Sequence, residues 1–229
     1  LALRIGATPF VQSSALAIVL LGARVFWSRD LDYTFLAWNL FLAWVPWVWA
    51  ALLREVHDRA ISLKESGDAK APLWRIAPFF LLWLAFLPNA PYLVTDFIHL
   101  RYRDGTSAPL WYDAIMLAAF AWAGVGLGVA SLRICSEVVR ARSRGPWTAT
   151  AFVATSGFLT GFGIYLGRFV RLNTWDVITR PLIVLDKVVE PLVHPLSHPR
   201  AWVVTFTFAL FFLAAYGTGR ARSRDQDAT

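Results

Sequence analysis

The chain has 229 residues, of which 57% are hydrophobic and only 16% are charged, and its mean hydropathy is +0.51. A soluble domain is about 45–50% apolar, with about a quarter of its residues charged. This composition therefore excludes an ordinary soluble protein and predicts a polytopic protein whose main partner is the lipid bilayer. The net charge of +7 comes from basic residues between the apolar blocks. That placement is typical of membrane flanks and does not indicate nucleic-acid binding.

Six stretches are long and apolar enough to cross about 30 Å of hydrocarbon. They do not alternate between polar and apolar residues, so we expect transmembrane helices and an all-α fold. The first stretch is predicted to be an uncleaved span, because bulky Phe26 and Trp27 stand where a cleavage site needs small residues. Arg24 is expected to snorkel from its end. The predicted spans are residues 9–27, 33–53, 76–95, 114–132, 145–167 and 201–219, in a single transmembrane domain over residues 1–219 followed by a disordered cytoplasmic tail over 220–229.

The basic residues predict the orientation. With six spans, 13 of the 22 Lys and Arg residues fall on the side that holds both termini, and nine fall on the other side. Because cytoplasmic loops carry the excess of Lys and Arg, we expect both termini to be cytoplasmic and the protein to lie in the cell inner (plasma) membrane. The side of the membrane opposite the termini is called the outer side.

The third span ends in the segment "FLPNAPYLVTDFIHLR", residues 86–101. Pro88 and Pro91 each remove a backbone donor and disfavour helix in the preceding residue, so the helix is predicted to break near Asn89. Asn89 is a candidate cap for a helix that restarts there. In such a helix Tyr92, Asp96 and His99 share one polar face at i, i+4 and i+7.

Three interpretations of Asp96 and His99 stay open. In the structural one, Asp96 pairs with Arg168 or Arg171 to hold the outer loops together, and His99 forms an ordinary interfacial hydrogen bond. In the catalytic one, they are an acid and a general base. In the third, they bind zinc with Asp176 and His194 or His198. These residue types suit zinc, but no compact ligand spacing exists, so neither a metal nor a cofactor is expected.

The fifth span ends in "GRFVRLNTWD", residues 167–176. Arg168 and Arg171 are three residues apart and are expected to project from one face of a continuing helix. Two interpretations stay open: they capture a phosphate or carboxylate, or they snorkel and form ion pairs. Asn173, Trp175 and Asp176 follow, and Asn173 is predicted to cap a short helix that begins at Thr174. Residues 181–196 are too short and too charged to span, and predict an interfacial or re-entrant segment.

Two long motifs carry a family resemblance. The segments "FLPNAPYLVTDFIHL" and "GIYLGRFVRLNTWD" resemble the bacterial integral-membrane family known as domain of unknown function 1361, and the similarity covers roughly residues 17–218. The resemblance implies a small polytopic membrane protein, and it brings neither an established activity nor assigned catalytic residues. The positions that match the motifs are Pro88, Asn89, Pro91, Tyr92, Asp96, His99, Gly167, Arg168, Arg171, Asn173, Trp175 and Asp176.

These features predict an outward-facing polar pocket between the end of the third span and the loop after the fifth. We expect it to bind an anionic, lipid-linked ligand such as a lipid-linked phosphate. The ligand contacts are predicted to be Asn89, Tyr92, Arg168, Arg171, Asn173, Trp175 and Asp176, with Asp96 and His99 as the acid/base pair if chemistry occurs. The alternative is a non-enzymatic membrane scaffold or complex subunit whose outer charges are structural. Transport is disfavoured, because no charge lies at the centre of any predicted span. The sequence decides neither the oligomeric state nor whether a reaction is catalysed.

Overall fold

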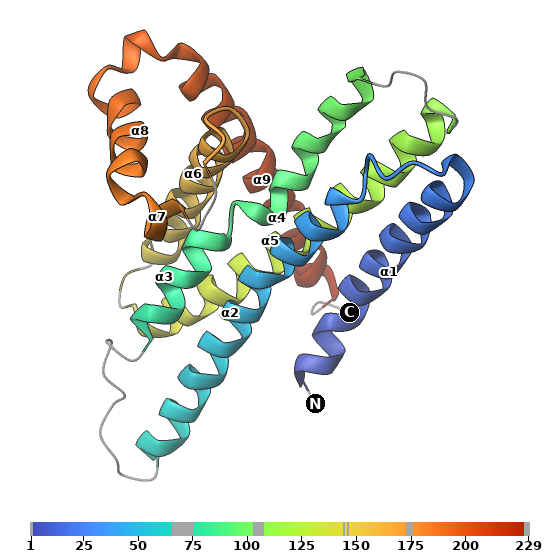
Figure 1. The fold of residues 1–229 in the computed structure, drawn as a ribbon. Coiled ribbons are helices and arrows are strands. Elements are labelled where there is room, and N and C mark those ends of the chain that lie inside the picture. Colours follow the sequence, from blue (N-terminus) through green and yellow to red (C-terminus); the bar gives the residue numbers. More distant parts are fainter. Residues whose placement is uncertain are drawn as a thin grey trace. The chain divides into compact units, whose positions relative to one another are not determined.

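The computed structural model describes residues 2–65, 76–102, 108–143, 145, 147–172 and 176–226, and these residues form helices without a strand (Figure 1). Within these ranges six helical segments are long and apolar enough to cross a membrane. The predicted all-α, six-span fold is therefore confirmed. The observed spans are Ala7–Ser28, Phe35–Ile61, Ala77–Arg101, Leu110–Arg142, Thr148–Arg168 and Pro199–Thr218.

Contacts along the chain group it into two compact units, Leu1–Ser131 (unit 1) and Leu132–Thr229 (unit 2). Helix α5 (Leu110–Arg142) passes from one unit to the other. The single transmembrane domain expected from the sequence stays a prediction.

Unit 1 contains α1 (Ala2–Ser28), α2 (Phe35–Glu65), the interrupted third span and the first part of α5. Its core is built from alanine, leucine and a few larger apolar side chains on all four segments. In lipid the hydrophobic effect does not drive helices together, so close packing and internal hydrogen bonds must hold them. One such bond joins the buried Trp83 indole nitrogen to Ser131 Oγ at 3.1 Å. The buried core residues include Ala17, Leu21, Leu36, Leu40, Ala43, Ala90, Leu93, Met116, Leu117, Phe120, Ala123 and Leu127.

The predicted break in the third span is observed. Helix α3 (Ala77–Phe86) ends before Leu87 and Pro88, and a short α4 (Asn89–Tyr92) follows. The backbone nevertheless stays in the right-handed helical region at Leu87 and Pro88, so the path continues instead of turning away. Asn89 does not cap α4. Its Nδ2 donates to the carbonyl oxygen of Phe86 at 3.0 Å, which satisfies an acceptor at the break.

A 3-10 helix, η2 (Leu93–Tyr102), continues from α4 for ten residues. Runs longer than three or four residues are uncommon in this geometry, and they often mark a hinge or a strained sequence. The expected restart as an α-helix is therefore wrong beyond Tyr92. Because η2 has about three residues per turn, Asp96 and His99 align with Leu93, and Tyr92 lies about a third of a turn away.

Unit 2 is organised around the antiparallel packing of α6 (Thr148–Arg168) on α9 (Pro199–Gln226). Glycines allow the close approach. A Cβ atom on Gly161 would lie 2.1 Å from the carbonyl oxygen of Thr205, and one on Gly157 would lie 2.7 Å from the Leu213 side chain. Gly157 and Gly161, which are four residues apart, thus pack within the chain, as small residues do at helix crossings in membranes. The last span ends at Thr218, next to the predicted end at residue 219, and the helix itself continues to Gln226.

Between α6 and α9 the chain forms three short helices. They are α7 (Asp176–Thr179), α8 (Pro181–Val193) and the 3-10 helix η3 (Pro195–Ser197). Helix α8 has 13 residues, or about 20 Å at 1.5 Å per residue. This is too short to cross the bilayer, as expected from the sequence.

We expect Gly161→Ala to destabilise the protein by about 1–3 kcal/mol, because the added methyl group meets backbone that cannot move freely. The control is Gly217→Ala on α9, where an added Cβ meets nothing within 4 Å and helix propensity improves by up to about 1 kcal/mol. Thermal unfolding in mild detergent measures both variants. Equal stability of the two would contradict the tight α6–α9 crossing.

Candidate functional site

Buried polar side chains gather at one end of unit 1. They come from α1, α2, η2, α5 and the turn between α1 and α2, which brings together residues separated by as many as 89 positions. We call this group the buried polar cluster. Its members are the buried Arg24, Tyr33, Asp96 and Asp113 and the partly exposed Asp30, Asn39 and His99.

Arg24 is the centre of the buried polar cluster. Its Nε donates to Asp113 Oδ1 at 2.9 Å, and its Nη1 donates to Asp30 Oδ1. The guanidinium carbon also lies 4.3 Å from the centre of the Tyr33 ring, which is a cation–π contact. Both Arg24 and Asp113 are fully buried, so the predicted snorkelling of Arg24 is wrong. A charge that is paired and hydrogen-bonded inside the protein does not need to reach the interface.

The turn after α1 places Asp30 beside Arg24. Arg29 adopts a left-handed conformation with φ 56°, and its N–H donates to the Val25 carbonyl at 2.9 Å, which ends the helix. The chain then reverses, and Asp30 returns to the last turn of α1. The hydrogen bond from Arg24 is the main cause that holds the pKa of the Asp30 carboxyl below its ordinary value of 3.8, with smaller contributions from the Asp32 N–H and the Ser28 hydroxyl.

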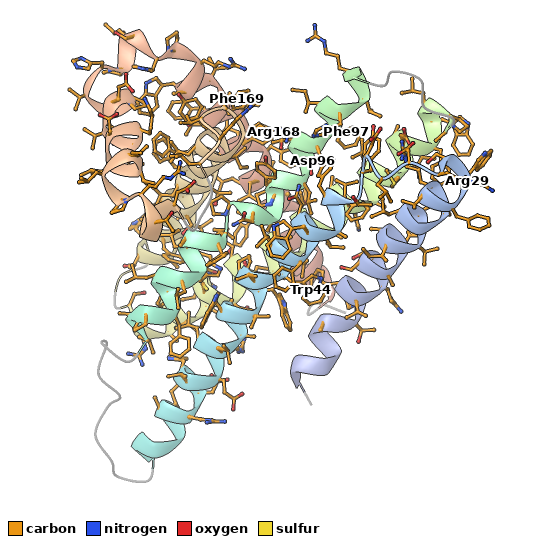
Figure 2. The ribbon with its side chains drawn as sticks, in the orientation of Figure 1. Arg29, Trp44, Asp96, Phe97, Arg168 and Phe169 are labelled. Carbon is orange, nitrogen blue, oxygen red and sulfur yellow. The ribbon has the colours of Figure 1, made fainter. Side chains whose placement is uncertain are left out.

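Asp96 and His99 both face α2. Asp96 is completely buried and accepts a hydrogen bond from Asn39 Nδ2 at 3.1 Å, whereas the next residue, Phe97, is exposed (Figure 2). The His99 ring packs on Phe35 at 4.7 Å. Phe35 and Asn39 are one turn apart on α2. The Phe35 ring therefore contacts His99, and the Asn39 amide contacts Asp96.

Tyr33 joins the two halves of the buried polar cluster. One face of its ring receives Arg24, and the centre of the ring lies 6.4 Å from the centre of the His99 ring in a T-shaped arrangement. Its hydroxyl makes a long hydrogen bond, 3.5 Å, to the His99 carbonyl oxygen. Tyr33 therefore links His99 to Arg24, while Asp96 bonds Asn39 on α2. The predicted ion pair of Asp96 with Arg168 or Arg171 would join unit 1 to unit 2 and stays a prediction.

The other predicted residues of unit 1 have local roles. Asn89 bonds the Phe86 carbonyl, and the carbonyl oxygen of half-buried Tyr92 accepts the Thr95 hydroxyl at 2.7 Å. Tyr92 does not share the face of Asp96 and His99, because the 3-10 geometry rotates it away.

Unit 2 carries a second polar group at the ends of α6 and α9, which we call the arginine group (Arg168, Arg171 and Arg200). Arg168 is half-buried at the end of α6, next to Phe169 (Figure 2). The Arg200 guanidinium carbon lies 4.4 Å from the centre of the Phe169 ring. This cation–π contact brings the first turn of α9 to the end of α6.

Arg171 is exposed and lies beyond the end of α6, where its φ of 63° places it in the left-handed region. The expectation that Arg168 and Arg171 share one face of a continuing helix is therefore wrong. A left-handed conformation costs a residue with a side chain about 1–2 kcal/mol, and it turns the chain away from the helix axis. In the described part of the chain Arg171 has no ion-pair partner.

The remaining predicted residues are only partly described. Asp176 begins α7, while Asn173 and Trp175 lie outside the described residues. Nδ1 of His198 lies 3.2 Å from the His194 carbonyl oxygen, and its Nε2 lies 3.5 Å from Glu190 Oε1. Within the described ranges no three His, Cys, Asp or Glu side chains form a group that could hold a metal ion.

Sequence analysis missed Asp113 and Asn39 as members of the buried polar cluster. A signal for both exists. Arg24 is the single basic residue of the first apolar stretch, Asp113 is the single acid between Ala108 and Leu132, and Asn39 is the single amide of the second stretch. Lone polar residues in spans are expected to find one another, because lipid offers no partner.

Residues 38–215 match the model of the family described as Protein of unknown function (DUF1361). The chain belongs to this family. The match covers most of the chain and includes Asn39, Asp96, His99, Asp113, Arg168 and Arg171. Comparison with curated proteins gives no match, and comparison with solved structures gives none. Membership of the DUF1361 family does not indicate an activity. A functional hypothesis must therefore be based on the buried polar cluster and the arginine group.

The Asp30–Arg24 bond makes the stability of this DUF1361 protein depend on pH. Since the pKa of Asp30 is lowered in the folded state, its contribution is complete above the unfolded value and is lost as the pH falls through the folded value. We expect Asp30→Asn to cost about 1 kcal/mol at neutral pH, because the pair is partly exposed. The difference from wild type should shrink below about pH 4.

Thermal unfolding over a pH series measures this difference. Asp32→Asn, which removes an exposed carboxylate from the same turn, is the control. A difference between wild type and Asp30→Asn that is constant or grows as the pH falls would contradict the assigned bond.

Proposed function

We propose that this membrane protein binds an anionic, lipid-linked ligand at the arginine group of unit 2. The observation that carries the proposal is the state of Arg171. Its guanidinium is exposed and has no ion-pair partner in the described residues. Its backbone is in the left-handed region, which residues with a side chain rarely adopt. The Leu172 N–H donates to the Leu166 carbonyl oxygen at 3.1 Å, so the left-handed turn closes the end of α6. It also leaves the Arg171 guanidinium exposed, which supports a role in binding an anion.

The neighbouring residues support an anion. Guanidinium groups bind phosphate and carboxylate with two parallel hydrogen bonds. Arg168 stands at the last turn of α6, next to Phe169 in the chain, and Arg200, in the first turn of α9, contacts the Phe169 ring. Arginines at the ends of two spans lie at the depth of lipid head groups, so a lipid-linked phosphate is the anion that reaches them most directly.

The proposal also includes the bacterial origin of the protein and its orientation in the membrane. The family resemblance supports a bacterial protein of the inner membrane. The excess of basic residues on the side of the termini supports cytoplasmic ends. The arginine group then lies on the outer side. The pocket expected between the third span and the loop after the fifth would join units 1 and 2 and stays a prediction.

A structural role for the charges is the second candidate function. Complete burial of Asp96, with its hydrogen bond from Asn39, favours it for unit 1. Asp96 and His99 remain the acid/base pair to test if the ligand is chemically changed, because they lie one 3-10 turn apart and on the same side of η2.

We expect the protein purified in mild detergent to carry a specific anionic lipid or polyprenyl phosphate, detected by mass spectrometry. Arg168→Gln should reduce the bound fraction at least about tenfold, as loss of a charge-assisted hydrogen bond of 1.5–3 kcal/mol requires. The control is Arg140→Gln, which removes an exposed arginine at the far end of unit 2. Equal retention by both variants would contradict the proposal and favour the structural role.

Arg171 offers a second matched pair. Both Arg171→Gln and Arg171→Gly remove the charge, but only glycine relieves the left-handed backbone. If the charge binds the ligand, both variants lose it, while the glycine variant is the more stable of the two. A glutamine variant that keeps the ligand would remove Arg171 from the site.

A further inference from the structure

Helix α8 presents a continuous apolar strip to its surroundings. Leu182, Leu185, Val189, Leu192 and Val193 are between 40% and 79% exposed. At 3.6 residues per turn these five positions fall within a sector of about 100°. A soluble surface does not maintain such a strip without a partner.

The other sides of α8 differ in character. Asp186, Lys187 and Glu190 occupy the adjoining sector and pair with one another, with Lys187 Nζ 3.4 Å from Glu190 Oε2 and 3.9 Å from Asp186 Oδ2. Pro191 is buried, and Val184 and Val188 are half-buried, on the third side. Because Lys187 pairs with both carboxylates within the helix, α8 can have one dehydrated face without leaving an isolated charge beside it.

The positions of the neighbouring spans α6 and α9 indicate where the apolar strip of α8 lies in the membrane. Only residues 194–198 separate the end of α8 from the start of α9, so this end lies at the membrane boundary where α9 enters. Figure 1 shows that α8 runs in the same general direction as α6 and not across it. Since α6 also runs toward that boundary, the beginning of α8 lies deeper along the direction of the spans than its end.

We propose that α8 is a re-entrant helix whose apolar strip contacts the hydrocarbon of the leaflet in which α6 ends and α9 begins, with Leu182 deeper than Val193. Its charged edge faces water, as charges at membrane depth require. This surface is separate from the arginine group and does not depend on a ligand. The partner is the bilayer itself, and a second copy of the chain is the alternative that the test must exclude.

The single cysteine makes the test direct. Cys135 is buried, so a Cys135→Ala background gives full-length protein in which one introduced cysteine at a time carries a spin label. Labels at Leu182, Leu185, Leu192 and Val193 report the strip, and labels at Asp186 and Glu190 report the charged edge. Leu210→Cys, on an exposed position inside α9, is the membrane reference, and Arg140→Cys is the reference for water.

In lipid nanodiscs the accessibility of each label to oxygen and to a water-soluble nickel chelate is measured. We expect the strip to resemble Leu210→Cys, with several-fold greater accessibility to oxygen than to nickel, and the charged edge to resemble Arg140→Cys. Depth should decrease from Leu182 to Val193. Nickel access along the strip would overturn the proposal by placing α8 in water, and equal depths would overturn re-entry. Shielding of the strip from both reagents would overturn it in favour of a second copy.

Discussion

The buried ion pair between Arg24 and Asp113 is the interaction on which unit 1 depends. It joins the first span to the fourth across 2.9 Å, where neither partner reaches solvent. In such surroundings a lone charge is strongly disfavoured, so each partner requires the other. Tyr33 and Asp30 enclose the same guanidinium, and Tyr33 carries the arrangement to His99. The turn after α1, the start of α2 and the position of η2 are therefore all set around one arginine.

Unit 2 achieves its packing differently. Gly157 and Gly161 bring α6 against α9 without a buried ion pair among the described residues, and the charged side chains remain at the helix ends. Small residues at the crossing maximise van der Waals contact, which is the main attraction available between apolar helices in lipid. Arg168, Arg171 and Arg200 lie at the helix ends, away from the glycine crossing, where the proposed anionic ligand would bind. This contrast separates a polar group that organises helices from one that can receive a ligand.

Much of the fold follows from sequence, because length and apolarity dictate membrane spans and two prolines dictate the break after Phe86. The 3-10 form of η2 does not follow from the sequence. Over ten residues, the pattern of polar and apolar positions fits a repeat of three residues as well as the α-helical repeat of about 3.6. Arg171 was misplaced because helix patterns do not show a left-handed turn at a residue other than glycine. The link from Arg24 to Asp113 was overlooked, although each is the lone charge of its type in its segment. To predict an ion pair between residues 89 positions apart, one must know which spans are neighbours in the fold.

A double-mutant cycle on Arg24→Gln and Asp113→Asn tests the central claim most directly, with unfolding measured in mild detergent. We expect each single change to cost about 3–5 kcal/mol, because it leaves a buried charge without its partner. The double variant should then cost no more than one single variant. The exposed pair of Arg59 and Glu55 on α2 is the control, and its coupling should stay below about 1 kcal/mol. Additive costs for Arg24 and Asp113, or single costs as small as those of the control, would contradict a fold organised around this ion pair.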